Sequence, residues 1–479
     1  MADAKPMLIG DEWINDSGAV LKSTNPATGA TNYEVCAATR AEVNRAVDTA
    51  RQAASASTWQ GMLPHQRARL LSGVAELIEA RADEFASLQM RENGKVWREC
   101  RAQALSASAI FRYYAAVCET ITESLTPSRG NYVSMTVHEP YGVVAAITPW
   151  NSPLTMEAQK VAPAIAAGNA VILKPSEITS SPALELGRAA LEAGLPPGIL
   201  NVLPGSGAVA GDALVRHPGV QFVSFTGGTE SGRRIAAAAA EKLMPVALEL
   251  GGKSPHVVFA DADIDAAVAA VSDGIFEGSG QSCVAGSRLF VQRSVHDRVL
   301  AGIVERAKAL RIDLPDAPGA QFGPLASFPH RDRVAAIVDK AKAEGGDVVT
   351  GGGRPPFEKL SGGAYYLPTV IAGLANTAGI CQQEIFGPVL CVLPFDDEDD
   401  LLQQANDSVY GLAAGIWTAD YRCAWRVARK LEAGTVWVNT YKQLSISTPF
   451  GGFKQSGIGR EKGTGGLRLY QQEKSLYFG

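Results

Sequence analysis

Short apolar runs alternate with helical stretches through most of this chain, and no other feature restricts its fold as strongly. Four such runs end at Gly, Pro or Ser and cover residues 142–150, 169–177, 198–207 and 220–228. Helical stretches such as residues 181–194 separate them. Strands that are apolar throughout need both faces covered, as in a parallel sheet with crossover helices. The sequence therefore predicts an α/β fold with buried parallel strands.

A second alternating series begins after residue 250 and predicts a second α/β domain. It passes through residues 288–310 and ends near residues 434–440. The chain of 479 residues also exceeds the size at which a single core keeps growing. At least two domains are therefore expected.

The start of one helix is marked in the sequence. Thr39 and Glu42 have the spacing of a capping box, in which side chains accept hydrogen bonds from the first free backbone amides. Apolar residues then recur on one helical face from Val43 to Ala50. The pattern predicts an amphipathic helix within residues 39–54.

Composition restricts the class of partner. The 44 Lys and Arg residues oppose 49 Asp and Glu residues, a net charge of −5, so we expect no nucleic acid or membrane partner. The seven cysteines form no CxxC pair and the six histidines lack metal-ligand spacing, so no disulfide framework or metal site is expected. The N-terminal residues do not resemble a signal peptide. We expect a cytoplasmic protein that acts on a small molecule.

Two glycine-rich turns follow strand-like runs and could each hold a phosphate group. Gly205, Gly207 and Gly211 depart by one residue from the dinucleotide-binding spacing. Gly227 and Gly228 precede the expected start of a helix, where free backbone amides can bind a phosphate. Either turn could instead be a tight turn without a ligand.

Charged side chains at the ends of apolar runs have similar pairs of interpretations. Lys174 and Glu177 could hydrogen-bond ribose hydroxyls at the edge of a sheet, or form a solvated surface pair. Glu249 could be a desolvated general base, or a carboxylate that caps a backbone amide. Glu384 could bind a ribose or lie in a solvated turn.

Cys283 and Asn151 are the remaining candidates for chemistry. Cys283 lies between small residues in "GQSCVAG", so it is either a nucleophile that a substrate can approach or an ordinary buried cysteine. Asn151 could donate to a developing oxyanion, or cap the helix that follows it. The residue types alone leave both pairs open.

Taken together, seven segments stand in the order and approximate spacing of the NAD(P)-dependent aldehyde dehydrogenase superfamily. They are residues 148–151 (TPWN), 173–177 (LKPSE), 225–232 (FTGGTESG), 249–253 (ELGGK), 280–283 (GQSC), 384–388 (EIFGP) and 449–457 (PFGGFKQSG). The chain resembles that superfamily over nearly its whole length. The resemblance implies two Rossmann-like parallel-sheet α/β domains plus a small oligomerisation arm.

The same resemblance implies domain boundaries and an assembly. The cofactor-binding domain is expected at residues 1–120 and 139–250, and the catalytic domain at residues 251–449. An arm of residues 121–138 and 466–479 would leave strand edges exposed in a monomer. A homodimer or homotetramer is therefore expected.

The resemblance gives Cys283 the role of the nucleophile that forms a thiohemiacetal with an aldehyde and then a thioester. The Asn151 side chain and the Cys283 backbone amide correspond to the oxyanion hole. Glu249 corresponds to the glutamate that activates water to hydrolyse the thioester, which branches that transfer the acyl group to coenzyme A generally lack. The expected product is the carboxylic acid.

The implied cofactor is NAD, with NADP possible. The residues expected to bind it are Ile147, Thr148, Pro149, Trp150, Lys174, Ser176, Glu177, Gly207, Gly211, Phe225, Thr226, Gly227, Gly228, Glu384 and Phe386. Glu177 favours NAD because a carboxylate that faces the ribose repels a 2′-phosphate. Gly228 stands where many relatives have a serine, so one hydroxyl contact to the pyrophosphate is lost.

Matched by position, the substrate tunnel is expected to be lined by Ala102, Ser106, Ser152, Met156, Gln159, Ser282, Val284, Lys442, Leu444 and Phe450. These mostly small or polar groups favour a bulky or polar aldehyde, including a semialdehyde. They disfavour betaine aldehyde, whose quaternary ammonium needs an aromatic cage. Lys442 could pair with a carboxylate on the substrate, or be a solvated lysine at the rim.

Functions outside this class use fewer of these residues. A cofactor-independent thiol esterase could use Cys283 and Glu249, but it would not require Lys174, Glu177 and Glu384. A purely structural or binding protein would have no reason to combine Cys283 with Glu249. The sequence therefore favours the dehydrogenase.

Overall fold

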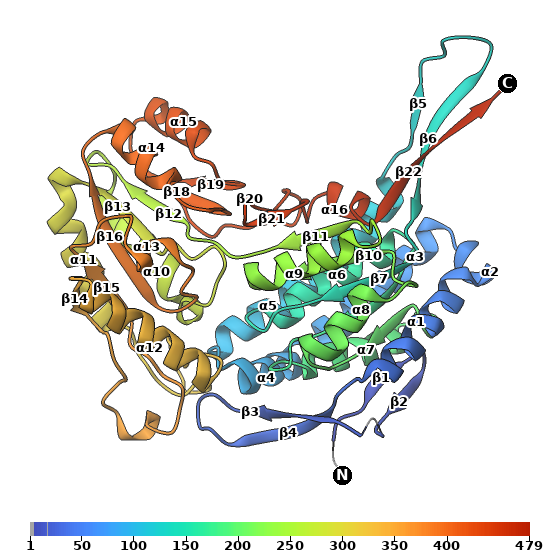
Figure 1. Ribbon diagram of the computed structural model, residues 1–479, viewed down its shortest axis with the longest axis horizontal. Coiled ribbons are helices and arrows are strands. Elements are labelled where there is room, and N and C mark those ends of the chain that lie inside the picture. Colours follow the sequence, from blue (N-terminus) through green and yellow to red (C-terminus); the bar gives the residue numbers. More distant parts are fainter. Residues whose placement is uncertain (1–3, 17) are drawn as a thin grey trace.

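The computed structural model describes residues 4–16 and 18–479 as two α/β lobes and a projecting arm (Figure 1). The first lobe holds an eight-stranded sheet in the order β2-β1-β9-β8-β7-β10-β11-β21. Its strands are β1 (Met7–Ile9), β2 (Glu12–Ile14), β7 (Val143–Ile147), β8 (Ala170–Lys174), β9 (Leu200–Val202), β10 (Phe222–Thr226), β11 (Val246–Glu249) and β21 (Gly457–Ile458). Strands β7 to β11 are parallel, which confirms the predicted sheet.

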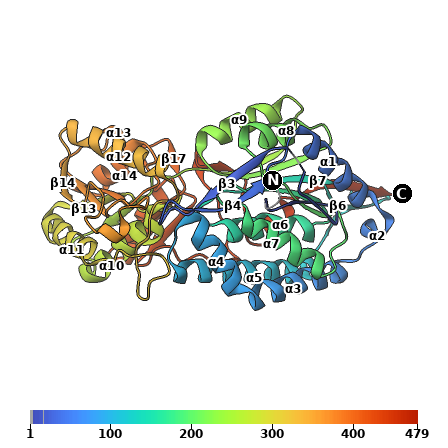
Figure 2. The ribbon, with the colours of Figure 1, turned by 90° about the horizontal axis from the view of Figure 1, so that it is seen from below.

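Helices cover both faces of this sheet (Figure 2). They are α1 (Arg40–Ser55), α2 (Ser57–Gln60), α3 (Pro64–Ala80), α4 (Ala82–Asn93), α5 (Trp97–Thr120), α6 (Pro153–Ala166), α7 (Ser181–Glu192), α8 (Asp212–Arg216), α9 (Thr229–Ala240) and α16 (Gly465–Arg468). Helices α1, α8 and α9 lie on one side, and α3 to α7 lie on the other. The apolar strands are thus buried on both faces, as the sequence predicted.

The predicted capping box is present at the start of α1. The backbone amide of Thr39 donates to Glu42 Oε2 over 2.8 Å, while the Thr39 side chain accepts from the first turn of the helix. Val43, Ala46 and Ala50 are buried on the face turned toward the sheet. This prediction is confirmed in its start and in its buried face.

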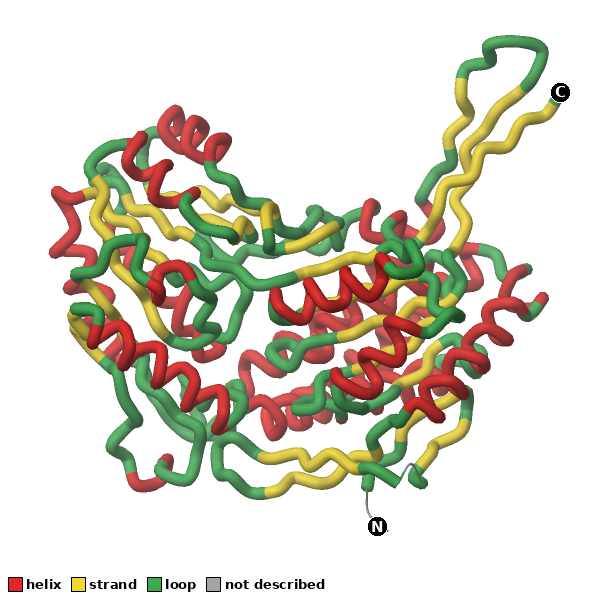
Figure 3. The backbone as a smooth tube through the Cα atoms, viewed as in Figure 1, coloured by secondary structure: helices red, strands yellow, loops and turns green. Residues whose placement is uncertain are grey.

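The second lobe holds a seven-stranded sheet in the order β14-β15-β16-β13-β12-β18-β19. Its strands are β12 (Pro255–Val258), β13 (Arg288–Gln292), β14 (Asp347–Thr350), β15 (Thr369–Ala372), β16 (Val389–Phe395), β18 (Ala413–Trp417) and β19 (Thr435–Val438). Helices α10 (Ile264–Phe276), α11 (His296–Ala309), α12 (Phe328–Ala343), α13 (Gly379–Gln382), α14 (Glu398–Asn406) and α15 (Tyr421–Lys430) surround it (Figure 3). Only β14 at one edge is antiparallel. The second α/β domain is therefore confirmed.

The arm is a three-stranded antiparallel sheet that projects from the first lobe (Figure 1). Its strands are β5 (Ser124–Thr126), β6 (Val133–Pro140) and β22 (Gln471–Phe478), in the order β22-β6-β5. Both outer strands have an unpaired edge. The hairpin of β3 (Val20–Thr24) and β4 (Thr31–Cys36) runs the other way and contacts the second lobe, where the Ala364 amide donates to the Pro26 carbonyl over 2.7 Å.

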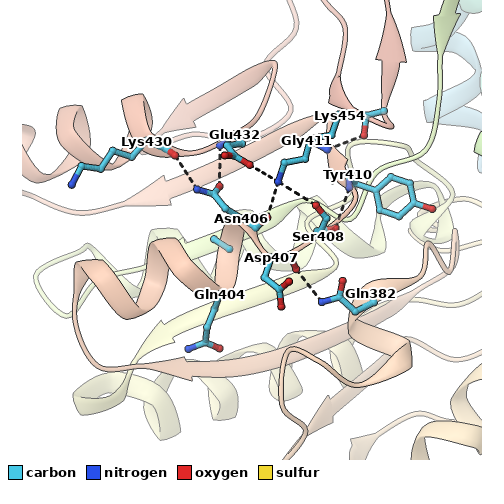
Figure 4. Close-up of polar contacts among 12 residues, drawn as sticks. Gln382, Gln404, Asn406, Asp407, Ser408, Tyr410, Gly411, Lys430, Glu432 and Lys454 are labelled. Atoms are coloured by element: carbon cyan, nitrogen blue, oxygen red, sulfur yellow. Dashed lines mark hydrogen bonds and ion pairs between the residues drawn. The ribbon is translucent and has the colours of Figure 1, made fainter.

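A crossover segment of residues 439–465 returns the chain from the second lobe to the first. Its short strand β20 (Phe453–Lys454) pairs with β17 (Tyr410–Gly411), and β21 pairs with β11. Lys454 donates to the carbonyl oxygens of Asn406 over 2.6 Å and Ser408 over 3.1 Å, and forms an ion pair with Glu432 (Figure 4). These contacts fix a segment that lies against both lobes.

Candidate active site

The carboxyl ends of four parallel strands of the first sheet bring separate sequence motifs to one edge. Ile147 lies opposite Lys174 on one side and Phe225 on the other, and Thr226 lies opposite Glu249. Ligands collect at this edge of open α/β sheets. The register therefore accounts for the meeting of motifs that are far apart in the sequence.

A cavity of about 380 Å³ lies at this edge and takes residues from both lobes. The residues predicted from sequence that line it are Pro149, Trp150, Asn151, Ser152, Met156, Gln159, Thr226, Gly227, Gly228, Glu249, Ser282, Cys283, Val284, Glu384, Phe386, Leu444 and Phe450. Leu250, Gly251, His330, Arg333 and Lys462 complete the lining. The three candidate catalytic side chains thus share one cavity.

Cys283 lies in a loop that follows α10, and Asn151 and Gln281 hold that loop. The Asn151 side-chain amide donates to the Gln281 carbonyl over 3.0 Å. The buried Gln281 side chain in turn donates to the Gly278 carbonyl over 3.2 Å and accepts from the Ala326 amide over 2.8 Å. Cys283 itself is half-buried at the cavity wall. Asn151 therefore lies directly beside the candidate nucleophile.

Two glycines of the "ELGGK" segment allow the loop and a carboxylate to approach. A Cβ at Gly252 would lie 2.3 Å from the Cys283 carbonyl oxygen, and one at Gly251 would lie 2.4 Å from Glu384 Oε2. The Gly252 amide also donates to Glu384 Oε1 over 3.0 Å. Any larger residue here would separate Cys283 and Glu384 from the end of β11.

Glu249 is a desolvated carboxyl, which matches one of the two interpretations that the sequence left open. It is 5% exposed, and neither side-chain oxygen accepts a hydrogen bond from the part of the chain that the structure describes. Burial raises the pKa of Glu249 well above its usual range, and the charge of Glu461 adds to the shift. Burial also raises the pKa of Glu384, to about 7. Glu384 can therefore change protonation near neutral pH, and the neutral form of Glu249 is favoured over its usual range.

The Cys283 thiol is hard to ionise in this cavity. Burial, together with the carboxylates of Glu384 and Glu249, raises the pKa of Cys283 to about 12. The Cys283 backbone amide and the Lys462 ammonium act in the opposite direction on this pKa. The thiol is therefore mostly protonated at neutral pH, and its reaction needs a base or an added positive field.

Two residues of α12 hold the "EIFGP" loop, and sequence reasoning missed both. A ring nitrogen of His330 lies 2.7 Å from the Phe386 carbonyl oxygen, and Arg333 donates to the Ile385 carbonyl over 2.7 Å. The Trp150 ring meets the rings of Phe386 and His330 edge-on, at centroid distances of 5.2 and 5.4 Å. Neither α12 residue stands beside a glycine motif or an apolar run that would have drawn attention to it.

The two glycine-rich turns differ in how many of their backbone amides already donate hydrogen bonds within the protein. In the first turn, the Gly207 amide donates to Glu177 Oε1 over 2.5 Å, and the amides of Ala210 and Gly211 donate to the Ser206 carbonyl. In the second turn, α9 begins after Gly228 without any side-chain cap. A Cβ at Gly228 would meet nothing within 4 Å. The free amides are therefore those at the start of α9.

The remaining residues of the predicted cofactor set lie outside the cavity along the same edge of the sheet. They are Ile147, Thr148, Lys174, Ser176, Glu177, Gly207, Gly211 and Phe225. The Lys174 ammonium lies 3.9 Å from Glu177 Oε1 and donates to the Pro175 carbonyl over 2.9 Å. Lys174 and Glu177 thus form a pair close to the first glycine-rich turn.

The structure places Lys442 away from the cavity that holds Cys283, which corrects its predicted position at the tunnel mouth. Lys442 lines a second, open cavity, where its ammonium lies 3.9 Å from Glu277 Oε2 and 3.5 Å from the Asp273 carbonyl oxygen. Lys442 has a left-handed backbone, with φ of 55°, and its partners Glu277 and Asp273 place its ammonium in the second cavity. Ala102 and Ser106, on α5, also lie outside the lining of the Cys283 cavity. The lysine that lines that cavity is Lys462.

Comparison with known sequences decides the family. Residues 13–476 match the model of the aldehyde dehydrogenase family. The chain belongs to this family. It is 41% identical over 462 residues to the DhaS protein of Bacillus subtilis (strain 168), whose name places it among the aldehyde dehydrogenases, covering 96% of this chain and 92% of that one. It is also 41% identical over 468 residues to the (Z)-2-((N-methylformamido)methylene)-5-hydroxybutyrolactone dehydrogenase of Acinetobacter baylyi, covering 97% and 95%.

Solved aldehyde dehydrogenases have the same fold. The betaine aldehyde dehydrogenase of Staphylococcus aureus in complex with NAD⁺ matches with a TM-score of 0.97 at 35% identity, over 100% of this chain and 95% of that one. The NAD⁺ complex of the Bacillus cereus aldehyde dehydrogenase matches with a TM-score of 0.97 at 38% identity, over 99% and 96%. The predicted family and the predicted aldehyde dehydrogenase fold are both confirmed.

Membrane-spanning helices and metal clusters are both absent from residues 4–16 and 18–479 of this aldehyde dehydrogenase. None of the helices in those ranges has the length and apolar character needed to cross a membrane. The same residues contain no cluster of three or more His, Cys, Asp or Glu side chains that could hold a metal ion.

Proposed function

We propose that this enzyme oxidises an aldehyde to the carboxylic acid with NAD, through a thiohemiacetal and a thioester on Cys283. The observation that carries the proposal is the shared cavity, in which Cys283, Asn151 and Glu249 lie beside the uncapped start of α9. Membership of the aldehyde dehydrogenase family supports the reaction class. Each side chain then has a distinct task.

Solvent water takes the proton of the Cys283 thiol, and the thiolate then attacks the aldehyde carbon, so that the carbonyl oxygen gains negative charge. The Asn151 side-chain amide has two N–H groups. One donates to the Gln281 carbonyl, so the second is available to the aldehyde oxygen. No hydrogen bond from the Cys283 backbone amide to another described residue competes for it. One such donor typically stabilises the transition state by about 3 kcal/mol.

Glu249 removes a proton from the water that hydrolyses the thioester. Its two oxygens have no hydrogen-bond partner in the described chain, so a water in the cavity can donate to either of them. The raised pKa of Glu249 makes it a stronger base once ionised. Hydrolysis then releases the acid and regenerates the thiol.

The edge of the first sheet fits a dinucleotide, on two observations. The amides at the start of α9 have no side-chain cap, and the buried Thr226 hydroxyl beside them has no hydrogen-bond partner among the described residues. Glu384 and the Lys174–Glu177 pair would hold the two riboses. When bound, the nicotinamide accepts the hydride from the substrate. The Staphylococcus aureus and Bacillus cereus structures, both NAD⁺ complexes, support NAD as the cofactor.

The substrate side of the cavity favours a polar aldehyde. Ser152, Gln159 and Leu444 give no aromatic cage around Phe450, which argues against betaine aldehyde despite the likeness to a betaine aldehyde dehydrogenase. The Acinetobacter baylyi relative acts on a polar, oxygen-rich compound by its name. A polar tail on the aldehyde is therefore the better match.

The two lobes and the arm would divide the work. We assign cofactor binding to residues 1–120 and 139–250, catalysis to residues 251–449, and assembly to residues 121–138 and 466–479. The cavity between the lobes and the exposed edges of the arm sheet support this division. A homodimer or homotetramer is the assembly we propose.

The test is the rate of nicotinamide reduction by purified protein with NAD and with NADP, over aliphatic, aromatic and carboxylate-bearing aldehydes. We expect turnover with NAD to the free acid, and none after Cys283→Ala. Hydrolysis of p-nitrophenyl acetate without any reduction of NAD or NADP would instead support a thiol esterase that uses Cys283 and Glu249.

A further inference from the structure

Lys462 is a buried lysine whose ammonium has no hydrogen-bond or ion-pair partner among residues 4–16 and 18–479. It is 9% exposed and lines the cavity that holds Cys283. Among the described residues, its recorded contact is with the Phe450 ring, 5.1 Å from the ammonium to the ring centroid. The buried Lys160 shows the usual arrangement, with donation to Glu461 Oε1 over 2.5 Å and to Ser224 over 3.0 Å. Lys462 differs because no acceptor in the described part of the chain receives a hydrogen bond from its ammonium.

The nearby acidic groups do not fill this role. The Glu461 carboxylate is held by Lys160 and by Gln159. Glu249 shares the cavity, but burial raises the pKa of its carboxyl group well above the usual range. An isolated buried ammonium is costly, and an anion placed against it recovers part of that cost. Burial lowers the pKa of Lys462, and an anion placed beside the ammonium would raise it again. Lys462 is therefore a buried lysine of the cavity lining whose donors are open to a bound anion.

The backbone keeps this lysine in place. Phe450 and Glu461 exchange two backbone hydrogen bonds of 2.8 Å, so the residue after Glu461 is fixed relative to the Phe450 ring. Lys462 itself has a φ of 62°, a left-handed backbone conformation that residues other than glycine rarely adopt. The crossover segment thus presents a charged side chain at a position where its fold favours glycine.

We propose that Lys462 binds a carboxylate at the far end of the aldehyde, so that the natural substrate is an aldehyde with an anionic tail. The inference rests on the proposed function and names its substrate class. Lys462 takes the role that sequence reasoning had considered for Lys442. The aldehyde carbon would lie at Cys283 and the carboxylate would lie at Lys462, beside Phe450.

The experiment compares succinate semialdehyde with butanal, an uncharged aldehyde of the same chain length. We expect the wild-type enzyme to prefer succinate semialdehyde in kcat/KM. Lys462→Met should lower kcat/KM for succinate semialdehyde about 10- to 100-fold more than it lowers that for butanal. Lys462→Arg should keep much of the preference. The matched control is Lys442→Met, which removes a lysine of the second cavity and should leave the preference for succinate semialdehyde over butanal unchanged.

A binding measurement separates recognition from reactivity. Succinate should slow the alkylation of Cys283 by iodoacetamide in the wild-type protein, and it should lose this effect in Lys462→Met. An equal loss for both aldehydes in Lys462→Met, with slower alkylation before succinate is added, would mean that Lys462 acts on Cys283, and the proposal would fail. A wild-type enzyme without preference for the anionic substrate would also overturn it. No nicotinamide reduction with any aldehyde would instead refute the proposed function.

Discussion

Burial controls the protonation of the residues in the cavity, and Cys283 shows this most directly. Its pKa of about 12 follows from burial and from the two carboxyl groups in the same cavity, Glu384 and Glu249. A thiol with that pKa is ionised to about one part in ten thousand at pH 8. In the protein without cofactor, Cys283 should therefore be a poor nucleophile at neutral pH.

Alkylation of Cys283 by iodoacetamide without cofactor should therefore keep accelerating with pH. Burial disfavours the thiolate, which raises the pKa, so the rate should rise about tenfold per unit from pH 7 to pH 10. Mass spectrometry of the peptide that carries Cys283 measures this rate, with Cys283→Ser as the control. A plateau below pH 9 would show that the thiol is ionised more easily than its surroundings imply.

Glu249→Gln should stop turnover after the first half of the reaction. A neutral amide cannot take the proton from water, so kcat should fall about 10²- to 10⁴-fold, while one equivalent of reduced cofactor per site still forms rapidly. Because the pKa of Glu249 is raised, hydrolysis by the wild type should also increase as pH rises through that pKa. Stopped-flow absorbance measures both phases. A steady rate like that of the wild type would remove Glu249 from the role of base.

At the scale of single elements, a substitution at the start of α9 should affect both the stability of the fold and the affinity for NAD. Gly228 has the extended backbone of an N-cap and open space beside it, so a side chain fits there. Gly228→Asp should cap the helix and raise the free energy of unfolding by about 0.5 kcal/mol. The same carboxylate should weaken NAD binding about 10- to 100-fold if the pyrophosphate binds at the start of α9 as proposed, because the two negative charges would repel each other. Thermal unfolding and fluorescence titration measure the two effects. Gly228→Ser, an uncharged cap, should retain affinity; equal losses in both variants would exclude charge repulsion.

Elements with strong periodicity or capping signals could be predicted from the sequence, whereas loop positions could not. The start of α1 and strands β7 to β10 follow from local patterns of side chains. Lys442 and Lys462 lie on the same crossover segment, and both have left-handed backbones, with φ of 55° and 62°. The direction of a loop side chain depends on such angles and on partners from distant segments. From the sequence, Lys442 was predicted to line the cavity, whereas in the structure the lysine in the lining is Lys462.

On the scale of the whole molecule, the chain passes between the lobes and closes one cavity from both sides. Cys283 comes from the second lobe, Glu249 comes from the end of β11 in the first, and Lys462 comes from the crossover segment. The contacts of Lys454 with Asn406 and Ser408 tie that segment to the second lobe. A shift of one lobe against the other would therefore change the distance between nucleophile and base. The site is a property of the complete fold.

The arm leaves apolar side chains in water unless another copy covers them. Leu125 is 71% exposed and Tyr477 is 67% exposed, on a sheet whose outer strands have free edges. Free edges and exposed apolar side chains favour pairing with a second copy. We expect the full chain to elute at a multiple of its 50.4 kDa mass.

Removal of residues 471–479 should reduce the size of that assembly while each copy stays folded. The cut falls after Tyr470, whose carbonyl accepts from the buried Asn169 side chain over 2.9 Å, so this anchor is kept. Light scattering after gel filtration measures the mass, and circular dichroism checks the fold. A Leu125→Ser variant keeps all three strands and should weaken assembly less than the truncation, because strand pairing would remain possible. A truncated chain with the mass of the full-length assembly would show that the copies meet through another surface.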